Sequence, residues 1–206
     1  MKQLDEQLLL WFNQQNNAFW DFFWVFFTDK FLAIPFIGIL LLFVWKHANF
    51  KTTVFIGFVL IGLVGFTEVF ATLIKNFVAR PRPCSVNSEI VDQVRVVADS
   101  LFKGSLVDSN AEKCEKFSFF SAHAAVSTAI AVFLAMLFKQ TNKILFSVCL
   151  MWAFLVSVSR IYLGFHYPSD IFVGMIVGGL FGFVGVKVYE FIGSRFFSSF
   201  YFNPNK

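Results

Sequence analysis

The chain has 206 residues, of which 57% are hydrophobic and 20% aromatic, while only 15% are charged. Soluble domains carry about 25% charged residues, and a mean hydropathy of +0.69 excludes an ordinary soluble domain. The net charge of +4 is not gathered in one basic run, which argues against a nucleic-acid partner. Length and composition together predict a single integral membrane domain over residues 1–206, with the lipid bilayer as its surroundings.

Several apolar segments are long enough, or nearly so, to cross a bilayer, which takes about 20 residues. The first, 8–27, is interrupted by a run of Asn and Gln at 13–17. A short membrane span and an amphipathic helix at the interface therefore both stay open for it. Five further spans are expected, at 31–45, 52–74, 117–138, 144–158 and 171–192. The fold class predicted is all-α: a polytopic membrane helical bundle with five or six transmembrane helices.

Lysines mark the short connections between these segments. The connections 46–51 and 139–143 each contain two lysines and no acidic residue. Because short loops rich in Lys and Arg stay in the cytoplasm, both connections are predicted to be cytoplasmic. The long polar segment 75–116 and the stretch 160–170 then share the opposite, extracytoplasmic face.

The three cysteines are expected to differ in state. Cys84 and Cys114 lie towards the two ends of the long outer segment. In an oxidising compartment they would form a disulfide, worth roughly 3–4 kcal/mol for a loop of about 30 residues; two free thiols are the alternative. Cys149 lies inside an expected span and is predicted to be a small core residue.

The first of three polar clusters on the outer face follows the span 52–74. Lys75 stands at the end of that span, and Arg82 lies between Pro81 and Pro83. Proline disfavours helix in the residue before it, so the helix should end soon after Lys75 and Arg82 should leave on an extended chain. Taken alone, these cations are equally well explained as side chains snorkelling to the interface.

The second cluster stands at the start of an expected span. Ser121 suits the N-cap of a helix, and the backbone N–H groups of Ala122 and His123 would then point out of the helix end. Such an end binds anions through these donors and the helix dipole. Taken alone, the cluster also fits an ordinary cap with an interfacial histidine.

The third cluster lies between the last two spans. Arg160 ends one span, and Pro168 suits the first turn of the next. Asp170 lies four residues after His166, so it can fix the tautomer of the imidazole and leave the other nitrogen free to attack. An interfacial ion pair is one alternative, and a zinc site formed by His123, His166 and Asp170 is another.

The cations favour an anion over a metal. Lys75, Arg82 and Arg160 would repel a metal ion, so no metal is expected. With two histidines and a helix N-terminus they describe a site for a phosphate-like anion. Ionisable residues at membrane depth are costly and usually functional.

The three clusters resemble the signature of the type 2 phosphatidic acid phosphatase family, which reads K-x6-R-P, P-S-G-H and S-R-x5-H-x3-D. This chain supplies Lys75 with Arg82-Pro83, then Phe120-Ser121-Ala122-His123, then Ser159-Arg160 with His166 and Asp170. The resemblance covers about 52–190, including 75–116 as an extracytoplasmic loop. Phe120 and Ala122 replace the Pro and Gly of the family, which concerns the shape of the phosphate cradle and leaves the chemistry in place.

The resemblance implies a metal-independent membrane lipid phosphatase without a cofactor. His166 would be the nucleophile that takes the phosphoryl group, Asp170 would orient it, and His123 would protonate the leaving oxygen. The phosphate-binding groups would be Lys75, Arg82, Ser121, Ala122 and Arg160.

The implied substrate is a lipid phosphate or diphosphate of a bacterial inner membrane, cleaved at the outer leaflet by a site facing the periplasm. Undecaprenyl diphosphate, lipid A phosphate, phosphatidylglycerol phosphate and phosphatidate all stay open. A lipid phosphotransferase using the same residues is an alternative function, and a non-catalytic membrane transporter or scaffold is another.

Two further features lie outside the signature. Glu68 precedes Lys75 by seven residues, near the same helix face, and it is expected to pair with a cation rather than to touch substrate. Gly174, Gly178 and Gly182 form a small-xxx-small pattern. Close packing within one subunit is expected of them, and so a monomer, with a homodimer as the alternative.

Overall fold

The structure of the chain is a computed structural model that describes residues 2–15, 17–97, 114, 117–139 and 142–196. Within these ranges it contains seven α-helices and a short 3-10 helix, η1 (Val91–Gln93). The α-helices are α1 (Lys2–Asn13), α2 (Ala18–Thr28), α3 (Lys30–His47), α4 (Phe50–Val78), α5 (Ala122–Phe138), α6 (Lys143–Tyr162) and α7 (Pro168–Phe196). The all-α prediction is confirmed.

The helices that could cross a membrane correspond to the expected spans. α4, α6 and α7 are each long and apolar enough to cross alone. α2 and α3 meet the same requirement only together, as a pair bent by 51°. α5 is apolar but shorter, at 17 residues. The described residues thus hold three helices that are long and apolar enough to cross a membrane, or four if the bent pair is one span, in a helical bundle compatible with the five or six spans predicted.

The segment 8–27 is divided between two helices, so neither of its two interpretations holds for the whole segment. α1 ends at Asn13, and α2 begins after its N-cap Asn17, whose side chain accepts the Phe19 N–H at 2.8 Å. Asn13 is fully buried and its side-chain amide donates to the backbone carbonyls of Arg95 and Tyr162, each at 2.7 Å. The polar run therefore lies between two helices, and its first residue, Asn13, is docked on the protein.

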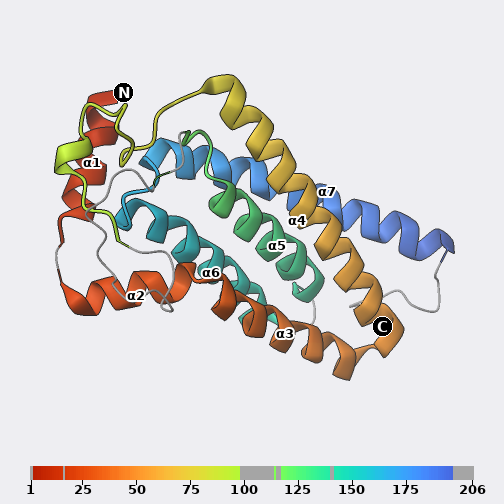
Figure 1. Cartoon of the computed structure of the whole chain (residues 1–206). Coiled ribbons are helices and arrows are strands. Elements are labelled where there is room, and N and C mark those ends of the chain that lie inside the picture. The colour runs from red at the N-terminus through yellow and green to blue at the C-terminus, as the bar shows by residue number, and fades with distance from the viewer. Residues whose placement is uncertain (1, 16, 98–113, 115–116, 140–141, 197–206) are drawn as a thin grey trace.

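α5 lies at the centre of the bundle, packed against α4, α6 and α7 (Figure 1). Of its 17 residues, 13 are buried, many of them alanine. A Cβ added to Gly178 would lie 2.2 Å from the carbonyl oxygen of Ala125, and one added to Gly182 would lie 2.6 Å from that of Ala129. The glycine pattern thus brings α7 against α5 within one chain, as predicted.

The outer surface of the bundle is apolar. Along α4, for example, one face is buried through Ile56, Leu60 and Leu63, while Phe58 and Ile61 are exposed. In a bilayer such exposed side chains meet lipid tails rather than water. The abundance of Phe, 32 residues in all, fits this requirement.

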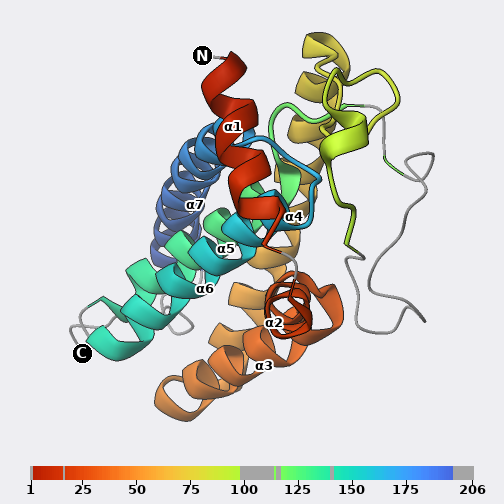
Figure 2. The ribbon, with the colours of Figure 1, turned by 90° about the vertical axis from the view of Figure 1, so that its left-hand side faces the viewer.

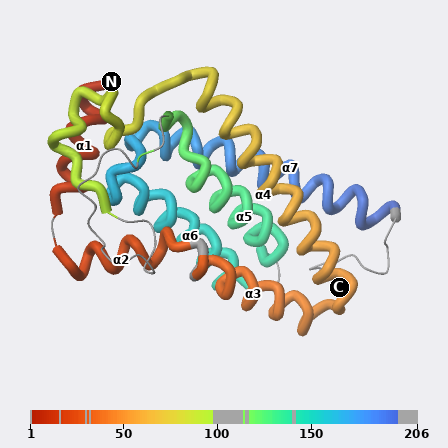
Figure 3. The backbone as a smooth tube through the Cα atoms, viewed as in Figure 1, coloured from red at the N-terminus to blue at the C-terminus, as the bar shows by residue number. Residues whose placement is uncertain are grey.

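The polar clusters gather at one end of the bundle. The C-terminal end of α4, the start of α5 and the connection from α6 to α7 lie together there, while α3 joins α4 at the other end (Figures 1 and 3). A quarter turn shows α1 beside the start of α7 (Figure 2), and the two helices are in contact. The N-terminal helix therefore lies at the same end as the predicted site.

Candidate active site

The end of α4 positions the first cluster. α4 carries Lys75 in its last turn and ends at Val78, as the following prolines predicted. Ala79 caps the helix in the left-handed conformation, with φ at 52°, and its N–H donates to the Lys75 carbonyl. This turn redirects the chain towards the start of α5.

A short antiparallel pairing brings the two ends of the outer segment together. Pro81 bridges to Phe117, and Arg82 Nε donates to the Phe117 carbonyl at 3.2 Å. The structure also joins Cys84 and Cys114 in a disulfide with Cα atoms 6.0 Å apart. Arg82 is thereby held beside the segment that enters α5; the rest of the predicted outer loop, 98–113 and 115–116, lies outside the described residues.

The start of α5 is fixed on the first turn of α7. Ser121 is the N-cap, as predicted, and its hydroxyl accepts the Ala124 N–H at 3.3 Å. Its own N–H donates to the Asp170 carbonyl at 3.2 Å. A Cβ added to Gly174 would lie 2.8 Å from the Ser121 carbonyl oxygen, so only glycine permits this approach. Ser121 and Ala122 are both buried.

His166 and Asp170 meet at the connection between α6 and α7. His166 is only 1% exposed, and its Nδ1 lies 3.7 Å from Asp170 Oδ2. That distance is too long for a hydrogen bond, and Nδ1 makes none with the described residues. The Asp170 oxygens instead accept from Arg80 Nη1 at 2.8 Å and from Tyr167 N at 3.1 Å.

Three cations act electrostatically on the His166 ring. Burial lowers its pKa well below the usual 6.5, and the charges of Arg82, Arg160 and Lys75 lower it further, while the backbone of Ser118 acts in the opposite direction. At neutral pH the ring is therefore uncharged and keeps the nitrogen lone pair that a nucleophile needs.

The two buried arginines share one aromatic ring. Arg160 places its guanidinium carbon 4.5 Å from the ring centroid of Phe165, and Arg82 places its own at 5.9 Å. Phe165 immediately precedes His166, so both guanidinium groups are held near the segment that carries His166. Their planar N–H donors match the oxygens of a phosphate group.

His123 opens onto a cavity of about 190 Å³ that it lines together with Glu68 and Thr28. Thr28 also accepts a hydrogen bond from Arg160 Nη1 at 3.1 Å, which connects the cavity to the cations. The wall is otherwise mostly apolar: Phe27, Ala33, Ile37, Val126, Ile130, Trp152 and Val156. Glu68 is exposed and has no ion pair with the described residues, so the expected pairing with a cation is not observed there.

Sequence patterns did not single out Arg80, although it stands in the same R-P-R-P stretch as Arg82. Its Nη1 donates to Asp170 Oδ1 and to Ser169 Oγ, both at 2.8 Å, and its Nη2 donates to Asp5 Oδ2 at 2.6 Å. Burial alone would lower the pKa of Arg80, but the neighbouring carboxylates of Asp170 and Asp5 raise it overall. The repeated Arg-Pro could have indicated from the sequence that Arg80 belongs to the site. No sequence pattern indicated Asp5, which lies 75 positions earlier.

The structure does not support the alternative of a zinc site. Within the described ranges, no three His, Cys, Asp or Glu side chains converge as metal ligands would. Thus His123, His166 and Asp170 do not form the three-ligand site considered from the sequence.

Comparison with known sequences identifies related proteins. The family model of the PAP2 superfamily matches residues 53–193. A lipid A 4'-phosphatase of Bacteroides thetaiotaomicron is 31% identical over 185 residues, which cover 89% of this chain and 76% of the relative. A lipid A 4'-phosphatase of Porphyromonas gingivalis is 28% identical over 196 residues, covering 94% of this chain and 76% of the relative.

The fold also has a counterpart among solved structures. LpxE of Aquifex aeolicus superposes with a TM-score of 0.63 at 24% sequence identity, covering 89% of this chain and 95% of that protein. At this identity the similarity shows a common helical fold.

Proposed function

Because the chain belongs to the PAP2 superfamily and is a membrane phosphatase, we propose that it hydrolyses a phosphate monoester of lipid A at the outer leaflet of a bacterial inner membrane. The observation that carries the chemistry is the neutral, buried His166 among three cations. The choice of lipid A rests on the relatives, two of which are lipid A 4'-phosphatases.

The first step of the proposed reaction forms a phosphohistidine. A ring nitrogen of His166 attacks the phosphorus atom, and a P–N bond forms while the ester P–O bond breaks. The electron pair of the broken bond stays on the sugar oxygen, which His123 protonates as general acid. Asp170 lies beside Nδ1 and stabilises the positive charge that the ring acquires, so Nε2 is the attacking atom.

The second step returns the enzyme to its starting state. Water attacks the phosphorus atom, His123 accepts its proton, and the P–N bond breaks to release inorganic phosphate. In both steps Lys75, Arg82 and Arg160 hold the non-bridging oxygens as negative charge develops on them. The backbone N–H groups of Ala122 and His123 add donors at the start of α5.

An extracytoplasmic site is supported by two observations. The lysine-rich connection 46–51, and Lys139 and Lys143 at the facing ends of α5 and α6, belong to the end of the bundle away from the site (Figure 1), and such lysine-rich connections stay in the cytoplasm. The disulfide between Cys84 and Cys114 suits an oxidising compartment such as the periplasm.

Glu68 is proposed to face the leaving group. The general acid must lie beside the leaving oxygen, and His123 shares its cavity with Glu68. The sugar attached to that oxygen therefore extends towards Glu68, whose carboxylate can accept a hydrogen bond from a hydroxyl or amide N–H.

The direct test is phosphate release from purified lipid A by the detergent-solubilised protein with a chelator present. We expect release by the wild-type chain and none by His166→Ala, with mass spectrometry locating the phosphate lost. His47→Ala is the matched control, because His47 lies at the end of α3, away from the site, and should keep full activity.

Two results would count against the proposal. Full activity of His166→Ala would exclude His166 as the nucleophile. Release from prenyl diphosphate or phosphatidate but not from lipid A would exclude lipid A as the substrate.

A further inference from the structure

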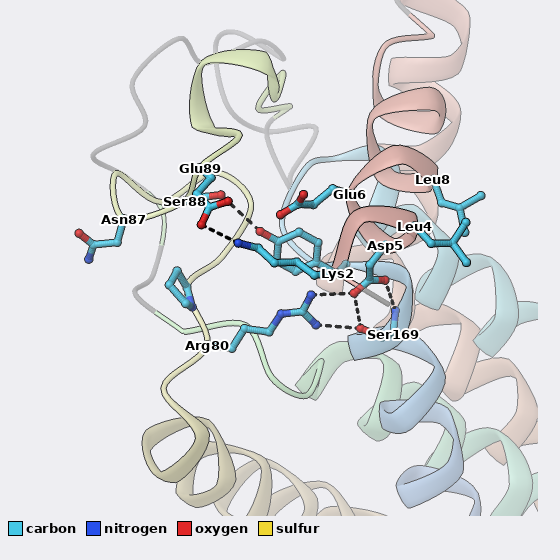
Figure 4. A pocket seen from close by; sticks show the side chains of 12 residues that line it. Lys2, Leu4, Asp5, Glu6, Leu8, Arg80, Asn87, Ser88, Glu89 and Ser169 are labelled. Carbon is cyan, nitrogen blue, oxygen red and sulfur yellow. Dashed lines mark hydrogen bonds and ion pairs between the residues drawn. The ribbon is translucent and has the colours of Figure 1, made fainter.

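Asp5 connects the N-terminal helix to the site. Its side chain is 10% exposed, and its Oδ2 accepts from Arg80 Nη2 and from the hydroxyl of Ser169. Its Oδ1 accepts the backbone N–H of Ser169 at 2.9 Å. Asp5, Arg80 and Ser169 point toward one another in the wall of a cavity of about 750 Å³ (Figure 4).

Arg80 continues the connection inward. Its Nη1 donates to Asp170 Oδ1 at 2.8 Å, and its guanidinium carbon lies 3.9 Å from the ring centroid of Tyr167. Two carboxylates thus hold the edges of the guanidinium group, and an aromatic ring covers one face. Asp170 is fully buried, and a buried carboxylate needs such a charged hydrogen-bonding partner.

We propose that Asp5 and Arg80 are positioning residues for the reaction. Asp5 fixes Arg80, Arg80 fixes the carboxylate of Asp170, and that carboxylate stabilises His166 during attack. This inference rests on the proposed function of His166. It makes α1 part of the catalytic apparatus, although the family match begins only at residue 53.

This positioning role follows because the carboxylates of Asp5 and Asp170 share the one positive charge of Arg80. When Asp5 is replaced by Asn, Nη2 of Arg80 loses its charged acceptor, and the Arg80 side chain, 24% exposed, can turn towards solvent. Asp170 is then less firmly placed beside Nδ1 of His166. The loss falls on the transition state, in which the ring becomes positive, and not on phosphate binding by Lys75, Arg82 and Arg160. A fall in kcat with little change in KM follows.

The experiment measures kcat and KM of Asp5→Asn and Arg80→Gln on a lipid phosphate that the wild-type protein hydrolyses. We expect kcat to fall about 10- to 100-fold, as for other residues that orient a reacting side chain. The double variant should be no slower than Arg80→Gln alone, because Asp5 acts through Arg80. Arg80→Lys should recover only part of the rate, since an ammonium group cannot bridge both carboxylates.

A matched control separates this role from simple docking of α1. Asn13 also anchors α1, through the carbonyls of Arg95 and Tyr162, but it makes no contact with Arg80. Asn13→Ala should lower Tm and leave kcat of the folded protein near the wild-type value. Glu6→Gln, in the same cavity wall as Asp5, should change neither quantity.

Two outcomes overturn the proposal. One is a wild-type kcat for Asp5→Asn; the other is an equal loss of kcat in Asn13→Ala at the same change in Tm. If the wild-type protein itself releases no phosphate from any lipid phosphate, it is the proposed function that fails. The two failures are therefore distinguishable.

Discussion

His166 shows how the surroundings of one side chain set its chemistry. A histidine in water is partly protonated near pH 6.5, and a protonated ring cannot attack phosphorus. Here burial and three neighbouring cations lower the pKa of His166 well below that value. The groups proposed to bind the phosphate would therefore also keep the proposed nucleophile uncharged before the substrate arrives.

This lowered pKa predicts where activity is lost in acid. Because only the neutral ring attacks, kcat/KM should stay high through pH 6.5 and fall on the acid side with a midpoint below it. Folding stability should fall in the same window, since the unfolded chain binds a proton there that the folded chain does not.

A phosphate monoester itself titrates near pH 6, so the pH profile needs a second substrate. A thiophosphate ester has a lower second pKa than the phosphate ester. A midpoint that stays in place between the two substrates belongs to the enzyme; a midpoint that moves with the substrate, or one above pH 6.5, would contradict the assignment to His166.

The proposed position of Glu68 predicts that the enzyme is selective for the leaving group of its substrate. Glu68→Gln should lower kcat/KM about 10-fold for a sugar phosphate such as lipid A, because its neutral amide accepts a weaker hydrogen bond than a carboxylate does. It should have little effect on a prenyl phosphate, which offers no donor beyond the phosphate. Assay of both lipids with one preparation gives the ratio. An equal loss on both would show that Glu68 acts on the catalytic groups or on folding instead.

At the scale of helices, the contact between α5 and α7 positions the site. Gly174, Gly178 and Gly182 bring α7 against the backbone of α5. The same contact places Ser121 against Asp170, where the second and third parts of the signature meet. A change in helix spacing should therefore affect both stability and catalysis.

Neighbouring glycines in α7 offer a matched test of this spacing. A methyl group at Gly178 would meet the Ala125 backbone at 2.2 Å, whereas nothing lies within 4 Å of a Cβ built on Gly179. Gly178→Ala should thus destabilise the protein by about 1–3 kcal/mol, as overpacking does, and reduce activity. Gly179→Ala should be neutral or stabilising by up to about 1 kcal/mol. Thermal unfolding in detergent compares the two, and equal Tm values would refute the close contact.

The helices could be predicted from the sequence, whereas contacts between distant segments could not. Apolar length located α3 to α7, and the prolines after Lys75 gave the end of α4. The division of 8–27 was missed because it depends on Asn13 reaching the backbone at Arg95 and Tyr162. No pattern in the local sequence indicates such a long-range partner.

The predicted site shows the same limit. Lys75, Arg82, Arg160 and His166 follow fixed spacings, and the structure brings them together. The contact of Arg80 with Asp170 was not predicted, and neither was that of Asp5 with Arg80, because these residues lie 90 and 75 positions apart in the chain. The sequence also favoured a cation as partner for Glu68, since it does not reveal that this side chain opens into a cavity.

At the scale of the whole molecule, the two ends of the bundle carry different charged groups. One end holds the site, the disulfide and α1, and the other holds the lysine-rich connection between α3 and α4. This difference predicts an orientation with the lysine-rich connection in the cytoplasm, because positively charged short loops are retained there. A site at the outer end would meet substrate only in the outer leaflet.

Labelling of single cysteines in intact cells tests this orientation. Gln93 is exposed near the site, and Ala48 is partly exposed in the connection between α3 and α4. With a membrane-impermeant maleimide, Gln93→Cys should be labelled in intact spheroplasts and Ala48→Cys only after lysis. The wild-type chain is the background control: Cys84 and Cys114 are paired and Cys149 is buried, so it should take up little label. The reverse pattern would place the site in the cytoplasm, and hydrolysis would then have to occur at the inner leaflet.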